Sequence, residues 1–341
     1  MGKVGPILVR RSVLAFVALA FLVASAVAYA APQAKNDTQL ALVAYSTPTV
    51  AFGKLITAFQ QTSAGKGITF TQSFAGSEIQ ARAIIAGQPA DVVDLSHEAD
   101  MNTLVQAGLV DKNWNKNAYN GFVSRSVVVF VVRNGNPKKI RTWDDLVKPG
   151  VEVVTPNPFT SGGARWNVLA AYGAALRAGK TPKQAVDYLN KLFHNVVSQD
   201  TSARNALNTF LSGKGDVLIT YENEAILAQQ QNKPVYYLIP KATIQIENPI
   251  AVIAKSPNKA QAQAFVAFAA SAAGQKVWAD NGYRPVLQSV FKQYKAKYPP
   301  RPQLFKVGYV GGWAKATKQF FDPSTGIMAK IEQGLGVSTG G

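Results

Sequence analysis

The feature of this sequence that most constrains its fold is a repeated order of segments. An apolar run typical of a buried strand is followed by a small polar turn and then by an amphipathic run typical of a helix. Strands are predicted at 39–45, 68–74 and 90–95, and helices at 50–60, 78–86 and 101–107. Strands that alternate with helices in this way form a parallel sheet with helices on its faces. The sequence therefore predicts the α/β class.

The second half of the chain keeps this order without repeating the sequence. Further strands are predicted at 126–132, 151–154, 216–220, 236–239 and 249–253. Helices are predicted over 166–176, 185–193 and 203–211, and one long alanine-rich helix is predicted to cover most of 257–281. A chain of 341 residues with this pattern has room for about two domains.

The turn at 157–167, Asn-Pro-Phe-Thr-Ser-Gly-Gly-Ala-Arg-Trp-Asn, lies between a predicted strand and a predicted helix. The first N–H groups of a helix have no partner within the helix and point at whatever lies before it. Gly162 and Gly163 let these groups approach a ligand with no Cβ in the way, and Ser161 adds a hydroxyl. The pattern indicates an anion site, although an ordinary N-capped helix after a glycine turn uses the same residues.

Four other strand-to-helix turns carry small or polar residues: Ser46, Ser77, Ser202-Ala203 and Tyr221. Open parallel sheets bind ligands beyond the carboxyl ends of their strands, where helix N-termini gather. Several turns that each offer N–H or hydroxyl donors therefore favour one shared anion site more strongly than the first turn does alone.

The composition narrows the chemistry of such a site. The chain has no Cys and only two His, His97 and His194, so a thiolate site is excluded and a His-rich metal site is not expected. The 36 basic and 19 acidic residues give a formal net charge of +17. The charge is spread along the chain without a recognisable nucleic-acid-binding module, so it favours a field that draws in small anions. No cofactor and no metal are expected.

The N-terminus has the features of a secretory signal peptide. Lys3, Arg10 and Arg11 precede an apolar run at 13–27, and Ala28-Tyr29-Ala30 fits the small-x-small cleavage pattern. The apolar run is too short for a comfortable membrane span, and no Cys follows it to carry a lipid. We expect residues 1–30 to be removed by cleavage after Ala30 and the mature protein to stay in the periplasm.

Together these segments resemble the prokaryotic sulfate-binding proteins, the periplasmic receptors of sulfate/thiosulfate ABC importers. The resemblance extends over about 39–321, and its most specific parts surround Ser161 and Glu222. The matching segments are Ala44-Tyr45, Ala75-Gly76-Ser77, Ala90-Asp91-Val92-Val93, Asn157 to Asn167, Asp216 to Ala225, Asn281-Gly282-Tyr283-Arg284-Pro285 and Gly311-Gly312-Trp313-Ala314-Lys315-Ala316.

The resemblance implies a two-lobed periplasmic binding fold of type II, whose chain crosses between the lobes twice and holds its ligand between them. We expect lobe I at 38–123 and 252–331, lobe II at 128–246, and hinges near 122–130 and 247–252. In this family sulfate is held by uncharged donors, which suits a dianion that only accepts hydrogen bonds. The residues of this chain at the corresponding positions are Ser46, Ser77, Ser161, Gly162, Gly163, Ala203 and Tyr221. Arg165 and Arg204 match family arginines that would either steady the backbone or form surface pairs.

Three positions depart from the family pattern. Ser46 stands where the family usually has Asp, Tyr221 where it has Trp, and Glu78 where it has Gly. A carboxylate at position 78 suits the positive end of a helix but would repel a bound dianion. Glu78, Asp94 or Tyr221 could also accept a hydrogen bond from a protonated oxyanion. Phosphate and molybdate therefore remain alternatives to sulfate and thiosulfate.

The resemblance further implies a binding protein rather than an enzyme. Its partners would be sulfate or thiosulfate and the permease of an ABC transporter in the inner membrane, and we expect a monomer that binds no nucleic acid. A secreted hydrolase is the alternative from another class. Neither Ser77 nor Ser161 lies in a G-x-S-x-G turn, and two His leave little material for a Ser-His-Asp triad. Glu222 and Glu224 are spaced so that they share neither a strand face nor a helix face.

Overall fold

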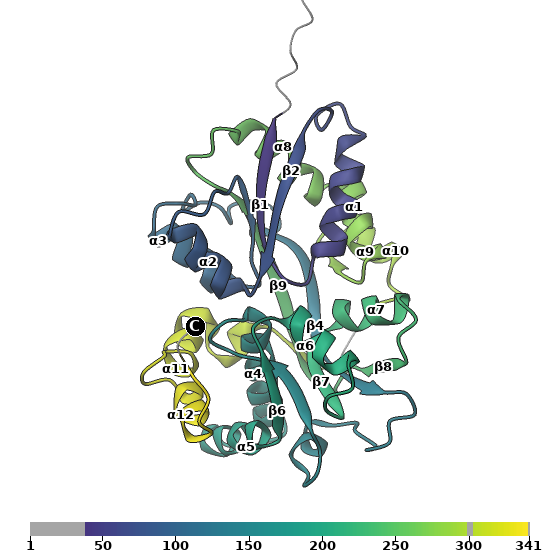
Figure 1. Ribbon diagram of the computed structural model, residues 1–341, viewed down its shortest axis with the longest axis vertical. Helices are drawn as coiled ribbons and strands as arrows, with labels where there is room; N and C mark the ends of the chain where they lie inside the picture. Colours follow the sequence, from purple (N-terminus) through teal and green to yellow (C-terminus); the bar gives the residue numbers. More distant parts are fainter. Residues whose placement is uncertain (1–37, 299–302, 340–341) are drawn as a thin grey trace, which may run out of the picture. The chain divides into compact units, whose positions relative to one another are not determined.

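The computed structural model describes residues 38–298 and 303–339 (Figure 1), so the predicted signal peptide at 1–30 lies outside the described residues. Strands and helices alternate along most of this part of the chain, as the sequence predicts. The strands are β1 (Gln39–Tyr45), β2 (Thr69–Ala75), β3 (Val92–Asp94), β4 (Phe122–Arg133), β5 (Val153–Pro156), β6 (Val196–Asp200), β7 (Val217–Tyr221), β8 (Val235–Leu238), β9 (Ala242–Val252), β10 (Arg284–Pro285) and β11 (Gln303–Phe305).

Most of the helices follow a strand after a short turn. The α-helices are α1 (Thr49–Gln60), α2 (Ser77–Ile85), α3 (Glu98–Gln106), α4 (Gly162–Arg177), α5 (Pro182–His194), α6 (Ala203–Leu211), α7 (Glu222–Gln230), α8 (Lys259–Ala270), α9 (Ala272–Asp280), α10 (Gln288–Gln293), α11 (Gly312–Phe320) and α12 (Ile327–Gly334). Two 3₁₀ turns, η1 (Trp143–Val147) and η2 (Val307–Val310), complete the elements. No helix in the described ranges is both long and apolar enough to cross a bilayer.

The sheet consists of two parallel groups joined by two long antiparallel strands. Its order is β2-β1-β3-β9-β4-β7-β5-β6. β1 pairs in parallel with β2 and β3, and β5 pairs in parallel with β6 and β7. β9 runs antiparallel to β3, and β4 runs antiparallel to β7. The predicted parallel pairing is confirmed within each group, and the antiparallel additions are β4 and β9, together with β8 and β10, which both pair with β4.

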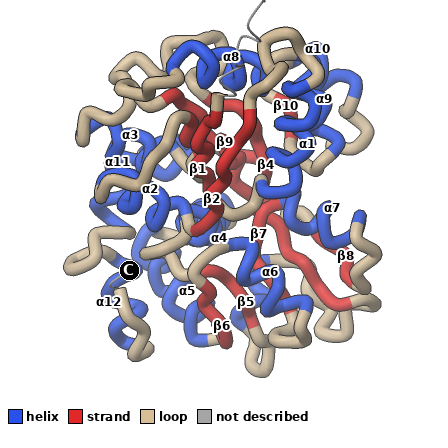
Figure 2. Tube along the Cα trace, turned by 45° about the horizontal axis from the view of Figure 1, so that its top comes forward, coloured by secondary structure: helices blue, strands red, loops and turns tan. Residues whose placement is uncertain are grey.

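The two long strands connect the halves of this two-lobed α/β fold. β4 and β9 pair with each other, with Ser126 opposite Ile246. One end of β9 pairs with β3, and the other end of β4 pairs with β7. In Figure 1, β1 and β2 accordingly lie above β4 and β9, and β6 lies below them, while Figure 2 shows β5 beside β6. The lobe limits and hinge positions given above stay predictions.

Alternating apolar side chains fix which helices cover which sheet face. Leu42 and Ala44 of β1 pack in a cluster with α1 and α9, whereas Val43 packs with α2 and α3. Successive side chains of a strand point to opposite faces of the sheet, so both sets are buried when helices cover both faces. Each group of parallel strands is therefore clamped between helices, which places the carboxyl ends of its strands and the N-termini of its helices at a shared edge.

Part of the C-terminal segment, which is predicted within lobe I as part of 252–331, packs against helices that follow β5. Trp313, Phe320 and Met328 lie in the same hydrophobic cluster as α4 and α5, and α12 packs against α5. The ring of Phe320 meets that of Tyr172 in α4 with centroids 4.8 Å apart. The apolar face of α11 therefore packs against α4, a pairing that no local pattern in 252–331 reveals.

The predicted long helix over 257–281 is wrong in one respect, because two helices, α8 and α9, occupy this region. Ser271 lies between them with an extended backbone, and its hydroxyl accepts a hydrogen bond from the N–H of Gly274 at 3.3 Å. A Cβ on Gly274 would lie 2.2 Å from the carbonyl oxygen of Phe268. Serine capping and this close backbone approach break a segment whose alanine content favours one continuous helix.

Candidate functional site

The turns singled out in the sequence meet around one small cavity. They follow β1, β2, β5, β6 and β7 and lead into α1, α2, α4, α6 and α7. In this structure the lining closes the space between them to less than the size of a water molecule. Its lining contains all seven predicted ligand-binding residues and two that the sequence did not single out: Ser46, Ser77, Ser161, Gly162, Gly163, Ala203 and Tyr221, with Tyr45 and Ser96.

The N-terminus of α4 forms one wall of the cavity. Gly162 and Gly163 are its first two residues, and Ser161 is its N-cap residue with no hydrogen bond from its side chain to the helix. A Cβ on Gly162 would lie 2.4 Å from the Ser96 hydroxyl, and a Cβ on Gly163 would lie 2.8 Å from the Tyr221 ring. Glycine is therefore required here for close packing, and the first N–H groups of the helix stay open toward the cavity.

The turn before α2 contributes differently from what the resemblance implied. The Ser77 hydroxyl donates to Oδ2 of Asp100 at 2.6 Å and accepts from the N–H of Ser96 at 2.9 Å. A serine hydroxyl has a single hydrogen, and in this arrangement that hydrogen is committed to Asp100. The backbone N–H of Ser77, the first residue of α2, is the donor left for an anion.

The turns before α1 and α6 meet each other across the cavity. Ala203 is the first residue of α6, whose N-cap is Ser202, and the Ser202 side chain accepts from the N–H of Asn205. The Ser46 hydroxyl accepts from the N–H of Arg204 at 3.4 Å. Capping by Ser202 fixes the start of α6 and directs the Ala203 N–H at the cavity.

Arg204 and Arg165 lie behind these walls and hold backbone carbonyls. Arg204 forms a two-point ion pair with Glu224, with both N–O distances 2.7 Å, and donates to the carbonyl of Thr47 at 2.7 Å. Arg165 donates to the carbonyl of Pro158 at 3.0 Å. Both side chains are largely buried. The geometry matches the backbone-steadying role rather than the surface pairs that the sequence also allowed.

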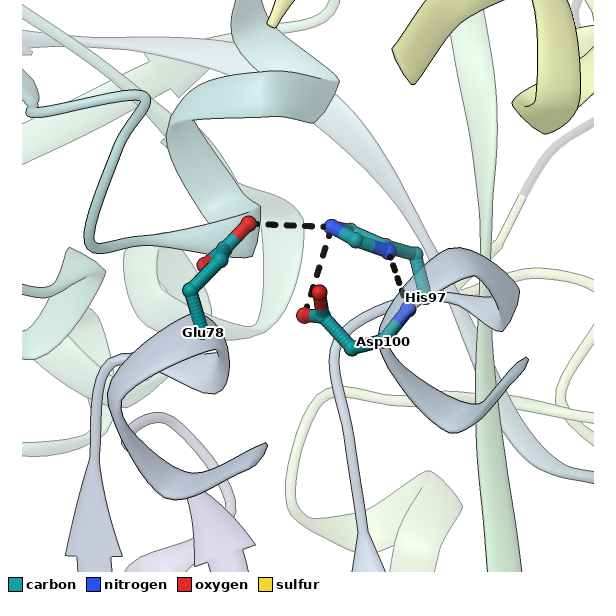
Figure 3. Close-up of side chains that lie close together, drawn as sticks. All are labelled: Glu78, His97 and Asp100. Carbon is teal, nitrogen blue, oxygen red and sulfur yellow. Dashed lines mark hydrogen bonds and ion pairs between the residues drawn. The ribbon is translucent and has the colours of Figure 1, made fainter. Parts of the chain in front are cut away.

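Glu78, His97 and Asp100 form a buried ionic cluster beside the cavity (Figure 3). Nε2 of His97 lies 3.2 Å from Oε1 of Glu78 and 3.4 Å from Oδ2 of Asp100. The N–H of Asp100 donates to Nδ1 of His97, so the hydrogen of a neutral imidazole is on Nε2 and faces the two carboxylates. Nε of Arg165 lies 2.7 Å from Oε1 of Glu78. The three groups that a metal ion could use are thus already paired with one another and with a guanidinium.

The cluster separates the pKa values of its two carboxyls. Burial acts to raise the pKa of Glu78, but Arg165 and His97 outweigh it and hold the pKa below its ordinary value. Burial, followed by the nearby charge of Glu78, raises the pKa of Asp100. Glu78 therefore carries the negative charge, and Arg165 faces it from α4. The repulsion that a carboxylate at position 78 would exert on an anion is offset by this pairing.

Asp94 does not belong to the cavity lining, although the sequence suggested it as a possible acceptor there. It is fully buried, and neither of its carboxylate oxygens has a hydrogen-bond partner among the described residues. Burial raises its pKa well above the ordinary value, which favours the neutral acid. Glu78 is engaged by Arg165, so of the three suggested acceptors Tyr221 alone lines the cavity.

The residues considered for hydrolase chemistry make other contacts. The Ser77 hydroxyl donates to Asp100 rather than to the imidazole of His97, so these residues do not form a Ser-His-Asp triad. His194 lies at the end of α5 and bonds the carbonyl of Asn190. Glu222 forms a two-point ion pair with Arg284, at 2.6 Å and 3.0 Å.

Tyr45 and Ser96 are the lining residues that sequence reasoning missed. Tyr45 is the last residue of β1, and Ser96 lies two residues beyond the end of β3. The rule that found the other turns, that ligands bind beyond the carboxyl ends of parallel strands, would also have found Ser96.

Comparison with known proteins agrees with this geometry. Residues 40–284 match the family described as bacterial extracellular solute-binding protein. The solved structure of the sulfate-binding protein SubI from Mycobacterium tuberculosis is 42% identical, covers 84% of this chain and 100% of its own, and superposes with a TM-score of 0.81. Sulfate-binding proteins of Salmonella typhimurium and Synechococcus elongatus are 41% and 39% identical. The alignments cover 84% and 88% of this chain and 91% and 88% of the two relatives.

The fold is therefore the type II periplasmic binding fold that the resemblance implied, with the candidate site between its two halves. The alignments with these relatives extend over most of the chain. This chain belongs to the bacterial extracellular solute-binding proteins, within the sulfate-binding protein family.

Proposed function

We propose that this protein is the receptor of an ABC importer and that it captures sulfate, or thiosulfate, in the cavity between its two halves. The observation that carries the proposal is the nature of the lining. Nine residues line the cavity, and all of them are uncharged. Their donors are hydroxyls and the N–H groups at the starts of α2, α4 and α6. A full dianion accepts hydrogen bonds only, and helix N-termini stabilise it without a salt bridge.

The surroundings favour a fully ionised oxyanion over a protonated one. Phosphate near neutral pH keeps a hydrogen, which needs a hydrogen-bond acceptor in the site. A negatively charged acceptor in the site would repel sulfate, which has no hydrogen to donate. Glu78 is paired with Arg165, and Asp94 lies outside the cavity. Phosphate is accordingly the weaker alternative, whereas molybdate, a full dianion like sulfate, differs from sulfate in size rather than in protonation.

The proposal also covers where the protein acts, what it delivers its ligand to, and whether it catalyses a reaction. An exported receptor of this class would reside in the periplasm after removal of 1–30, act as a monomer, and deliver its ligand to a membrane permease. The bonding of Ser77 and His97 described above supports binding without turnover.

Titration calorimetry of the mature, anion-stripped protein in a buffer free of oxyanions tests the proposal. Sulfate or thiosulfate is expected to bind one to one and more tightly than phosphate or molybdate. Ser161→Ala should weaken binding about ten- to a hundredfold, because a hydrogen bond to a charged group contributes roughly 1.5–3 kcal/mol. Ser212→Ala, whose hydroxyl donates to the carbonyl of Thr209 at the far end of α6, is the matched control. Tighter binding of phosphate would reject the choice of ligand, and hydrolytic turnover abolished by Ser161→Ala would reject the receptor itself.

A further inference from the structure

The backbone of Ser96 is fixed on both sides. Its N–H donates to the Ser77 hydroxyl, and its carbonyl accepts from Nε1 of Trp166 at 3.0 Å and from Nδ2 of Asn248 at 2.9 Å. The residue is 1% exposed. These three bonds come from different elements and determine the direction of the Ser96 side chain. A residue held in this way can present its hydroxyl at one point with little loss of entropy on binding.

The hydroxyl of Ser96 lies against the start of α4. Its oxygen would be 2.4 Å from a Cβ on Gly162, which places it directly on the first residue of that helix. The same oxygen is 2.7 Å from the Tyr221 hydroxyl, which reaches it from the end of β7. Ser96 therefore lies between the phenol and the helix N-terminus at which an anion would bind.

The number of hydroxyl hydrogens determines how many hydrogen bonds Ser96 and Tyr221 can donate to an anion. Two hydroxyls carry two hydrogens, and the bond between Ser96 and Tyr221 uses one of them. A phenol is more acidic than an aliphatic alcohol, so Tyr221 is the better donor and Ser96 the better acceptor. With Tyr221 donating, the remaining hydrogen belongs to Ser96, beside Gly162. A hydrogen bond received by Ser96 also polarises the one it donates.

We propose that Ser96 is the ligand-binding hydroxyl at this wall of the cavity, and that Tyr221 is a positioning residue that acts through it. This rests on the proposed function as an oxyanion receptor and goes beyond it by naming the donor. Tyr221, the predicted direct ligand, instead holds the Ser96 oxygen as an acceptor and turns its hydrogen toward the anion. The pair thereby presents one hydrogen and no free acceptor, which suits a fully ionised oxyanion.

A double-mutant cycle in sulfate titrations tests this arrangement. Ser96→Ala is expected to weaken binding at least tenfold, Tyr221→Phe only a few-fold, and the double variant about as much as Ser96→Ala, because the two residues act as one unit. A loss for Tyr221→Phe that equals or exceeds that for Ser96→Ala, with additive effects in the double variant, would identify Tyr221 as the direct donor and overturn the inference.

A second measurement separates positioning from a merely structural role. When the Tyr221 hydroxyl is removed, the Ser96 oxygen no longer accepts its hydrogen bond and can accept one from a protonated oxyanion instead. Tyr221→Phe should therefore lower the ratio of sulfate to phosphate affinity at neutral pH. Tyr298→Phe, which removes another buried hydroxyl that donates to the carbonyl of Ala279, should leave that ratio unchanged. Equal weakening of both anions by Tyr221→Phe would contradict the inference.

The unmodified protein distinguishes the two proposals. If it binds none of sulfate, thiosulfate, molybdate and phosphate, the proposed function and this inference both fail. If it binds sulfate and Ser96→Ala binds equally well, the receptor stands and the role of Ser96 alone is rejected.

Discussion

Glu78 shows how a single residue can reverse its expected effect through its partners. The sequence places a carboxylate beside the proposed anion, which on its own would repel a dianion. In the structure its Oε1 lies 2.7 Å from Nε of Arg165 and 3.2 Å from Nε2 of His97. Glu78 belongs to α2 and Arg165 to α4, so the pair joins the two halves beside the cavity. The carboxylate thus becomes part of what holds the halves together.

We predict that Glu78→Gln weakens sulfate binding about tenfold, mainly through faster release. Removal of one partner leaves Arg165 buried without its counter-ion when the halves are together, whereas solvent can reach it when they separate. Stopped-flow fluorescence measures release, and Trp166 and Trp313 lie near the cluster as reporters.

Asp187→Asn is the matched control for Glu78→Gln, because its pair with Lys183 is exposed and should have little effect. Tighter binding by Glu78→Gln would mean that repulsion of the anion outweighs the pairing. The pKa of Glu78 is lowered, so the contribution of the pair is complete above the ordinary glutamate pKa and is lost only as pH falls through the lowered value.

The strand-to-helix turn is the element that builds the site, and the turn after β2 shows how tightly these turns fit. A Cβ on Gly76 would lie 2.1 Å from the carbonyl oxygen of Thr160 and 2.7 Å from that of Thr201. Those carbonyls belong to the turns before α4 and α6. The turns therefore approach each other backbone to backbone, with no room for a side chain at position 76.

We predict that Gly76→Ala weakens sulfate binding at least tenfold with little change in the melting temperature. The backbone of Gly76 has φ −58° and ψ 144°, which alanine adopts without strain, so the methyl group acts only by holding the turns apart. Calorimetry and thermal denaturation measure the two effects.

Gly53→Ala in α1 provides the comparison for Gly76→Ala, because a Cβ at position 53 meets nothing within 4 Å. It should stabilise the fold by about 0.5–1 kcal/mol through helix propensity and leave binding unchanged. Unaltered affinity in Gly76→Ala would show that the turns need not approach this closely for binding.

The excess of positive charge is a property of the whole molecule rather than of the site. The lining carries no charge, yet the chain has a formal net charge of +17. A field of this sign raises the local concentration of anions and their association rate without a direct contact. Selectivity and capture are therefore divided between the cavity and the surface.

We predict that the association rate constant for sulfate falls several-fold between about 10 mM and 150 mM sodium chloride, where the Debye length shrinks from roughly 30 Å to 8 Å. The dissociation rate should change little, because the buried contacts are screened less. Stopped-flow mixing at several salt concentrations measures both constants. An association rate that does not depend on salt would show that the surface charge has no part in capture.

The order of strands, turns and helices, the α/β class, and the residues at most of the turns could be predicted from the sequence alone. These follow from local periodicity and capping, which act within a few residues. The convergence of Ser46 with Ser77, and of Ser161 with Ala203, was predictable because the carboxyl ends of the parallel strands within each group share one edge. Ser271 marks the limit of this reasoning, since alanine content favoured one helix where capping and close approach make two.

The contacts between the turns could not be predicted in this way, because they depend on how distant segments pack. Ser96 and Tyr221 are 125 residues apart, and their hydroxyls meet because two different strands end at one cavity. The same holds for the pairing of Glu78 with Arg165 and for the packing of α11 and α12 near α4 and α5. Contacts between distant segments leave no period in the sequence, because each partner satisfies its own local pattern whichever surface it meets.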